Sequence, residues 1–145
     1  MLEQALRFLK FRSRTVAELR SKLLERGYET EEVESVLVKL QEVKLLDDDR
    51  FVEHFIHDHL EIRRQGRWRI GLEMRRRQVP KEKIDQSVRE ITNEDELVVA
   101  SQLLESRQRS WQKLEPLARK RRAIGLLQRR GFAISVISQL IKKLS

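Results

Sequence analysis

The residues of this chain that could bind a metal ion or transfer a proton gather in one short acidic stretch. Asp47 to Asp49 offer three consecutive carboxylates, the ligand type that magnesium prefers. His54, His57 and His59 follow, and imidazole is a common ligand of zinc. On a helix His54 and His57 share one face while His59 points away, and the zinc-protease pattern of two histidines flanking a glutamate is missing. A solvated helix face with His57 beside Glu61 explains the histidines, so we expect no metal site.

A structural role also explains the three aspartates. Asp47 is placed to cap a helix, because its carboxylate can accept hydrogen bonds from the first free amides. The next two aspartates then lie at the positive end of the helix dipole. Leu46 and Phe51 fall at the two positions of a hydrophobic staple. We expect a long helix from about 47 to 64, begun by a structural motif of Leu46, Asp47, Asp48, Arg50 and Phe51.

Two clusters of basic residues are the remaining candidates for a functional site. Arginine predominates over lysine in both, which favours directed contact with phosphate or carboxylate groups. A run of charge is usually only a solvated face, but here the charges recur at matched positions, with Arg69, Arg76 and Arg77 aligned to Arg122, Arg129 and Arg130. We therefore predict a binding surface made of Arg67, Arg69, Arg75, Arg76, Arg77, Arg119, Lys120, Arg121, Arg122, Arg129 and Arg130.

Two tryptophans accompany the basic clusters. Trp68 lies inside the first cluster and Trp111 precedes the second. Aromatic rings of this kind can stack on nucleic-acid bases. Few other large side chains are available to fill the cores, so we expect both tryptophans to pack within the repeats instead.

The elements that carry these residues follow a pattern of apolar residues that occurs three times, at spacings of 51 and 53 residues. The first set is Leu19, Leu23, Gly27, Tyr28, Val33, Leu37 and Leu40. The second set is Ile70, Met74, Gln78, Val79, Ile84, Val88 and Ile91. The third set is Ala123, Leu127, Gly131, Phe132, Ile137, Ile141 and Leu144. Each set describes an apolar helix stripe, a turn, an apolar plug and a second helix stripe.

One such helix pair cannot enclose its own apolar face, so stacked copies must bury it together. With a further helix before each pair, the spacing predicts an all-α fold, an elongated curved array of three tandem three-helix repeats. We place the repeats at residues 1–46, 47–92 and 93–145. Thr15 and Glu18 form a predicted capping box at the start of a helix.

Composition narrows the class of protein. The chain has no cysteine, which excludes disulfides and thiolate metal sites. The longest purely apolar run, 97–100, is far shorter than the roughly 20 residues of a membrane span. No signal-peptide pattern, glycine-rich phosphate loop or serine beside a plausible base is present. We expect a soluble intracellular protein that is not an enzyme and needs no cofactor.

The charge is distributed unevenly along the chain. Residues 1–62 contain 10 Lys and Arg against 14 Asp and Glu, a net charge of −4. Residues 63–145 contain 21 against 9, a net charge of +12. This asymmetry points to an anionic partner for the C-terminal part of the chain.

Three blocks of sequence are similar to the RecX family of RecA regulators. They are LLDDDRF at 45–51, GRWRIGLEMRRRQVP at 66–80 and LLQRRGF at 126–132. The blocks stand in the family's order and at its spacing, and the resemblance covers almost the whole chain. The chain departs from the family pattern at Gln78 and Val79, where a glycine and an apolar residue are usual.

The resemblance implies a curved helical protein that lies in the groove of the RecA–DNA filament. It would block extension of the filament and so restrain strand exchange, ATP hydrolysis and coprotease activity. We further expect weak binding to single- and double-stranded DNA, a monomer, and a location in the bacterial cytoplasm, at the nucleoid when RecA is bound. The alternative is a sequence-nonspecific DNA-binding protein whose effects on RecA are secondary.

Overall fold

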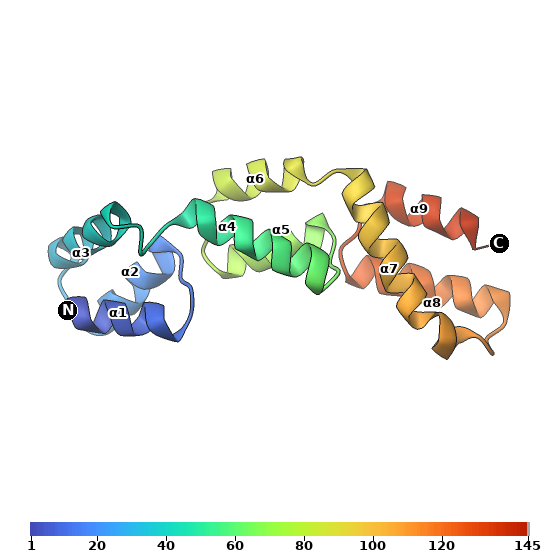
Figure 1. Cartoon of the computed structure of the whole chain (residues 1–145), viewed down its shortest axis with the longest axis horizontal. Helices are drawn as coiled ribbons and strands as arrows, with labels where there is room; N and C mark the ends of the chain where they lie inside the picture. The colour runs from blue at the N-terminus through green and yellow to red at the C-terminus, as the bar shows by residue number, and fades with distance from the viewer. Residues whose placement is uncertain (145) are drawn as a thin grey trace.

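The computed structural model describes residues 1–144, and its regular structure within this range is entirely helical. Nine α-helices and one π-helical segment form three consecutive three-helix groups, arranged end to end with the termini at opposite ends (Figure 1). The elements are α1 (Leu2–Phe11), α2 (Val16–Glu25), α3 (Thr30–Glu42), α4 (Asp48–Ile56), η1 (His57–Ile62), α5 (Arg67–Arg76), α6 (Lys81–Glu90), α7 (Asn93–Trp111), α8 (Pro116–Arg129) and α9 (Ile134–Lys143). The predicted all-α array of three-helix repeats is confirmed.

Three of the described helices, α2, α4 and α7, begin at a residue whose side chain caps them. The Thr15 hydroxyl accepts from the amide of Glu18 at 3.1 Å, and the Glu18 carboxylate accepts from the amide of Thr15 at 3.0 Å, which confirms the capping box. The third repeat begins with a similar box at Thr92. Asp47 caps α4, because its carboxylate accepts from the amide of Arg50 at 3.2 Å.

Each repeat turns between its second and third helices on a residue in the left-handed region. Gly27 and Gly131 have φ of 90° and 81°, values that glycine adopts without strain. Gln78 occupies the matched position in the second repeat with φ of 57°. The departure from the family pattern at Gln78 therefore keeps the same backbone turn.

The helix predicted from about 47 to 64 changes its winding partway. It is α-helical as far as Ile56 and continues as the π-helical η1. His59 is buried there, stacks on Phe55 with ring centroids 3.8 Å apart, and contacts the Gln65 amide oxygen through Nδ1 at 2.7 Å. His57 stays on the surface and pairs with Glu61 at 2.8 Å, as predicted. The histidines thus serve packing and surface pairing.

The apolar side chains form two separate cores. The first belongs to the first repeat alone and consists of Ala5, Leu19, Leu23, Val33, Leu37, Leu40 and Leu46. The second is shared by the second and third repeats, and it extends from Phe51 in α4 to Leu140 in α9. The three repeats have nearly equal spacing in the sequence, but the first repeat has its own core while the second and third share one.

Candidate functional site

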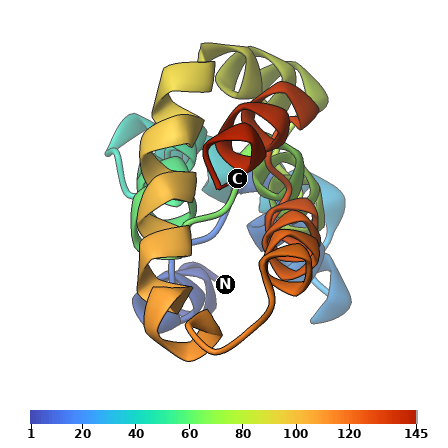
Figure 2. The same cartoon turned by 90° about the vertical axis from the view of Figure 1, so that its right-hand side faces the viewer.

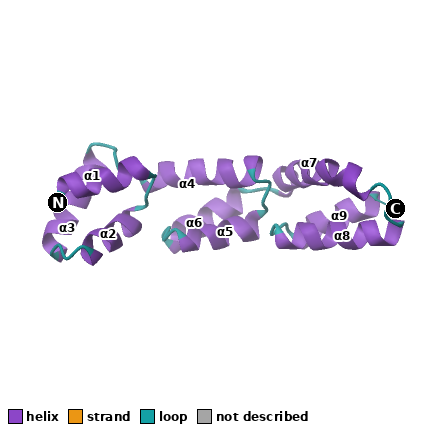
Figure 3. Cartoon of the chain, turned by 90° about the horizontal axis from the view of Figure 1, so that it is seen from below, coloured by secondary structure: helices purple, strands orange, loops and turns teal. Residues whose placement is uncertain are grey.

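The two basic clusters lie mainly on α5 and α8, the second helices of their repeats. Seen from below, the first helices of the repeats follow one edge of the molecule, and α2, α5 and α8 follow the other (Figure 3). The helices that carry most of the predicted site residues therefore lie along the same edge of the array. The surroundings of these residues divide them into three groups.

Arg77 belongs to the first group, which holds the repeats together. Its Nε donates to the Glu18 carboxylate at 2.9 Å, and its Nη2 donates to the carbonyl of Ser13 at 2.8 Å. The guanidinium also lies over the ring of Phe51, 4.9 Å from its centre. In return the Thr15 hydroxyl donates to the Arg77 carbonyl at 3.0 Å. We call these contacts, with the bond from the Val16 amide to Asp48 at 2.9 Å, the first joint.

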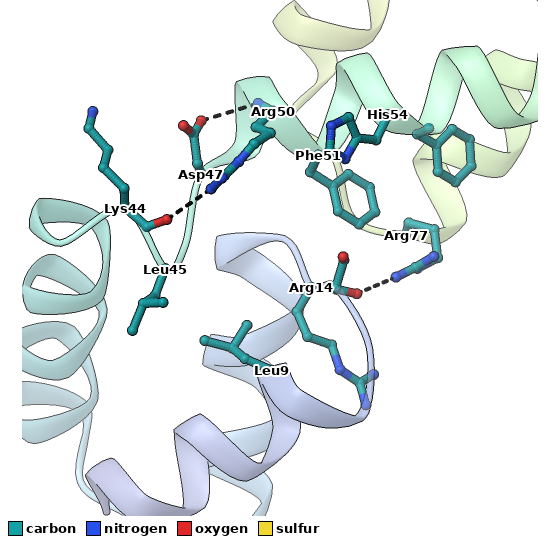
Figure 4. A pocket seen from close by; sticks show the side chains of 11 residues that line it. Leu9, Arg14, Lys44, Leu45, Asp47, Arg50, Phe51, His54 and Arg77 are labelled. Carbon is teal, nitrogen blue, oxygen red and sulfur yellow. Dashed lines mark hydrogen bonds between the residues drawn. The ribbon is translucent and has the colours of Figure 1, made fainter.

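The structural motif of the acidic stretch borders the same region. Leu46 is buried in the first core and Phe51 in the second, so the motif connects the two. Arg50 donates to the carbonyl of Lys44 at 3.2 Å and holds the connecting loop against the start of α4 (Figure 4). Burial raises the pKa of Asp48, although its bond from Val16 opposes the shift.

A pocket of about 440 Å³ opens beside the first joint. Figure 4 shows Leu9 and Leu45 on one side of it and Phe51 with Arg77 on the other. Arg14 lines the pocket with a largely buried side chain whose Nε has no hydrogen-bond partner. Burial, followed by repulsion from another arginine, lowers the pKa of Arg14. These groups belong to the contact between the repeats.

Arg130 and Arg67 complete the first group at what we call the second joint. Here backbone meets backbone: the Gly66 amide donates to the Arg130 carbonyl at 2.7 Å, and the Trp68 amide donates to the Gly131 carbonyl at 3.1 Å. The Arg130 side chain donates to the carbonyl of Arg63. Burial lowers the pKa of Arg130, and Arg107 is the first of several nearby arginines that lower it further.

Glu96 is the residue of the second joint that sequence reasoning missed. Its side chain is 0% exposed and accepts three bonds, from the Arg67 amide at 2.7 Å, the Arg67 Nε at 2.9 Å and the Ala133 amide at 2.9 Å. The signal for it was available, because Glu96 stands four residues after the cap Thr92, where Phe51 stands after Asp47. A glutamate at an apolar helix position indicates buried partners.

The second group consists of Arg69 and Arg76, which flank Glu73 on α5. The Nε of Arg69 lies 3.0 Å from the Glu73 carboxylate, at an angle too poor for a hydrogen bond, so this contact is an ion pair. The Arg76 side chain donates to the same oxygen at 3.2 Å. The single negative charge of Glu73 thus offsets one of the two positive charges of Arg69 and Arg76.

The third group carries charge without a partner and lies mostly on α8. In the aligned third repeat, Leu126 stands where Glu73 stands in the second, so Arg122 and Arg129 flank an apolar residue. Within residues 1–144, no hydrogen bond or ion pair engages the side chains of Arg75, Arg119, Lys120, Arg121, Arg122 and Arg129. The positive charge that remains free is therefore concentrated on α8.

The two tryptophans differ in their burial. Trp111 is partly buried and packs against the second core, as predicted. The packing prediction is wrong for Trp68, whose side chain is 73% exposed. Trp68 follows the N-cap Gly66 by two residues, and its backbone amide takes part in the second joint while its side chain faces solvent.

In the described part of the chain, no group of three or more His, Asp or Glu side chains is arranged to hold a metal ion. None of the helices in that part is long and apolar enough to cross a membrane.

Three family models match the chain in order. The first, second and third three-helix domains of RecX match residues 2–40, 47–88 and 94–141. The regulatory protein RecX of Mycobacterium sp. (strain JLS) is 38% identical over 141 residues, which cover 94% of this chain and 76% of that protein. The regulatory protein RecX of Trichlorobacter lovleyi is 37% identical over 144 residues, covering 96% and 92%.

Solved structures share the fold. The crystal structure of RecX from Lactobacillus salivarius superimposes with a TM-score of 0.86 and 17% identity, and the match covers 99% of this chain and 93% of that one. A second crystal structure, of a regulatory protein RecX, gives a TM-score of 0.80 and 24% identity over 98% of this chain and 71% of that one.

Proposed function

This chain belongs to the RecX family, and on that basis we propose that it regulates the RecA recombinase by binding the RecA–DNA filament. Binding would limit extension of the filament and so restrain recombination and coprotease activity. The protein would act as a monomer in the bacterial cytoplasm, at the nucleoid when RecA is bound. Its role is binding rather than catalysis, in keeping with a family of regulatory proteins.

One observation of the structure supports the proposal most directly: among the predicted site residues, the unpaired basic side chains within residues 1–144 are concentrated on α8 of an elongated array. A filament of protein and DNA offers a long anionic groove, and an elongated ligand with a strongly basic helix can lie in it. The free arginines of α8 are suited to both phosphates and carboxylates, because guanidinium binds either in a bidentate way. Long-range attraction would also speed the encounter.

Filament growth tests the proposal. RecA is assembled on single-stranded DNA with increasing amounts of the purified protein, and extension is followed by RecA-dependent ATP hydrolysis and by light scattering. We expect extension to slow as the protein is added. Unchanged extension at protein concentrations equal to that of RecA would refute the proposal.

A pair of matched variants tests which surface acts. Arg76→Glu with Arg129→Glu should weaken the inhibition strongly without changing the helix content. Arg12→Glu with Arg20→Glu, in the acidic first repeat, should weaken it much less. Because Arg20 pairs with Glu34 and Arg12 lies near Glu18, a cleaner control reverses Arg7 and Arg89, which are exposed and unpaired among the described residues.

A stand-alone DNA-binding protein is the second candidate, favoured by the unpaired arginines of α8. Such a protein would bind DNA equally well without RecA, and its affinity would fall steeply with salt. A filament ligand would bind the RecA–DNA complex far more tightly than DNA alone. Binding measured with and without RecA at several salt concentrations therefore separates the two functions.

A further inference from the structure

The free charge of the third repeat surrounds a pocket. Figure 2 looks along the molecule at this end, where α7 and α8 lie on opposite sides and a short loop joins them. Between them opens a pocket of about 430 Å³, a size typical of small-ligand sites. Arg107 and Trp111 line it from α7, one helical turn apart, and Arg121, Arg122 and Arg129 line it from α8.

The pocket has four arginines in its walls and no carboxylate. None of the four guanidinium groups takes part in a hydrogen bond or ion pair within residues 1–144. Like charges held this close repel one another, and the pKa of neighbouring Arg130 is lowered partly by Arg107 and Arg129. An anion between α7 and α8 would relieve this repulsion.

The floor of the pocket is apolar and aromatic. Leu126 is buried beneath the arginines, and Gly125 contributes no side chain to fill the space. Trp111 is partly buried, packs against the second core and also lines the pocket. A partly buried indole beside a cationic wall offers a stacking platform to a planar group that carries negative charge.

We propose that this pocket binds a nucleotide of a single-stranded nucleic acid, with its phosphates on the arginines and its base on Trp111. The inference rests on the proposed function and deepens it, because it assigns the DNA contact to one place in the third repeat. A carboxylate from a protein would satisfy the arginines but would leave the aromatic floor without a planar partner. A nucleotide of a paired duplex cannot present the face of its base to Trp111.

The chain offers a simple reporter for this site. It contains two tryptophans, so the variant Trp68→Phe leaves Trp111 as the single source of indole fluorescence. Titration of this variant with a 12-nucleotide oligothymidylate, without RecA, should quench the fluorescence of Trp111. The same length of double-stranded DNA should quench it much less. Unchanged Trp111 fluorescence while the strand binds would overturn the proposal.

Charge reversal locates the phosphates. Arg121→Glu with Arg129→Glu should weaken oligothymidylate binding about tenfold or more and lower the salt slope by about 1.4, or 0.7 for each phosphate contact. Arg7→Glu with Arg89→Glu changes the net charge equally at exposed positions far from the pocket, and should weaken binding less than about threefold. Equal weakening by the two pairs would show long-range attraction only and would overturn the site.

Two competitors distinguish the chemistry. A strand of abasic sites carries the phosphates without bases, and it should bind at least about fivefold more weakly because stacking is lost. Poly-glutamate of similar charge should compete poorly. Equal binding of the abasic strand, or of poly-glutamate, would overturn the nucleotide assignment.

The outcome is separable from that of the proposed function, because these titrations contain no RecA. If Arg121→Glu with Arg129→Glu abolishes strand binding but still slows RecA filament growth, the pocket is confirmed and filament regulation depends on other contacts. If the variant binds the strand normally and no longer slows growth, the pocket assignment fails while the proposed function stands.

Discussion

The first and second joints occupy matched positions in the array but are made of different atoms. At the first joint a hydroxyl and a guanidinium reach across the gap, since Thr15 donates to the backbone of Arg77 and Arg77 donates to the backbone of Ser13. At the second joint the main chains touch directly, through Gly66 and Gly131. The apolar core stops at the first joint and continues through the second.

One missing side chain accounts for much of this contrast. A Cβ atom on Gly66 would lie 2.5 Å from the Gly131 carbonyl oxygen, so only glycine permits this approach. Thr15 holds the matched position in the first repeat, and its side chain keeps the next repeat at a distance. Close approach lets two repeats share a core, whereas a side-chain bridge leaves two cores. We infer that the second and third repeats form one body and the first repeat another.

We expect the largest difference between the joints in the unfolding free energies of the variants Gly131→Ala and Gly27→Ala. Both positions have positive φ, but a Cβ on Gly131 would lie 2.3 Å from the Arg69 amide nitrogen, while a Cβ on Gly27 meets no atom within 4 Å. We expect Gly131→Ala to lower the free energy of unfolding by about 3–5 kcal/mol and Gly27→Ala by about 1 kcal/mol. Urea unfolding followed by circular dichroism measures both, and similar losses would show that the second joint is not close-packed.

One carboxylate from each joint, Glu96 and Asp48, gives the next largest effect. Glu96 is fully buried and accepts three bonds, so Glu96→Gln should cost about 2–3 kcal/mol of unfolding free energy. Asp48 is partly exposed and accepts one inter-repeat bond, from Val16. Asp48→Asn should cost no more than about 1 kcal/mol, because an amide oxygen can still accept that bond. A larger loss for Asp48→Asn would reverse our ranking of the joints.

The smallest expected effect is the pH dependence of the contribution that Asp48, at the first joint, makes to the unfolding free energy. Burial raises the pKa of Asp48 in the folded protein above its unfolded value of about 3.9. The folded state therefore binds this proton more readily, so the Asp48 contribution to the unfolding free energy rises as pH falls through the folded pKa. Below the unfolded pKa the gain is complete.

The variant Asp48→Asn isolates this contribution, since it removes the titrating group. The difference in unfolding free energy, wild type minus variant, should increase as the pH is lowered from 6 to 3.5. A difference that decreases as the pH is lowered over this range would mean that the bond from Val16 outweighs burial.

Local sequence signals predicted the local structure well. Thr15 with Glu18, and Asp47 before α4, identified helix starts because a cap depends only on residues three or four positions apart. The turns at Gly27 and Gly131 and the three-helix repeat could be predicted for the same reason. Resemblance to a known family then predicted the family to which the chain belongs.

Contacts between repeats were less predictable. Alignment placed Arg77 and Arg130 in a binding face, but both also hold the joints, because residues 59 to 67 positions away supply their partners. Glu73 beside Arg69 and Arg76 could have been recognised from its spacing along one helix. The binding role of the basic residues stays a prediction.

The division into two cores also sets an order in which the chain can fold as it is synthesised. Every residue of the first core lies before Asp47, so this repeat can close as soon as that stretch leaves the ribosome. The core begun by Phe51 is completed only by Leu140 in α9. At about 5–20 residues per second, the middle repeat waits roughly 2–10 s for its partner, with the surface destined for the third repeat uncovered. Chaperones that bind nascent chains would find their target in that interval.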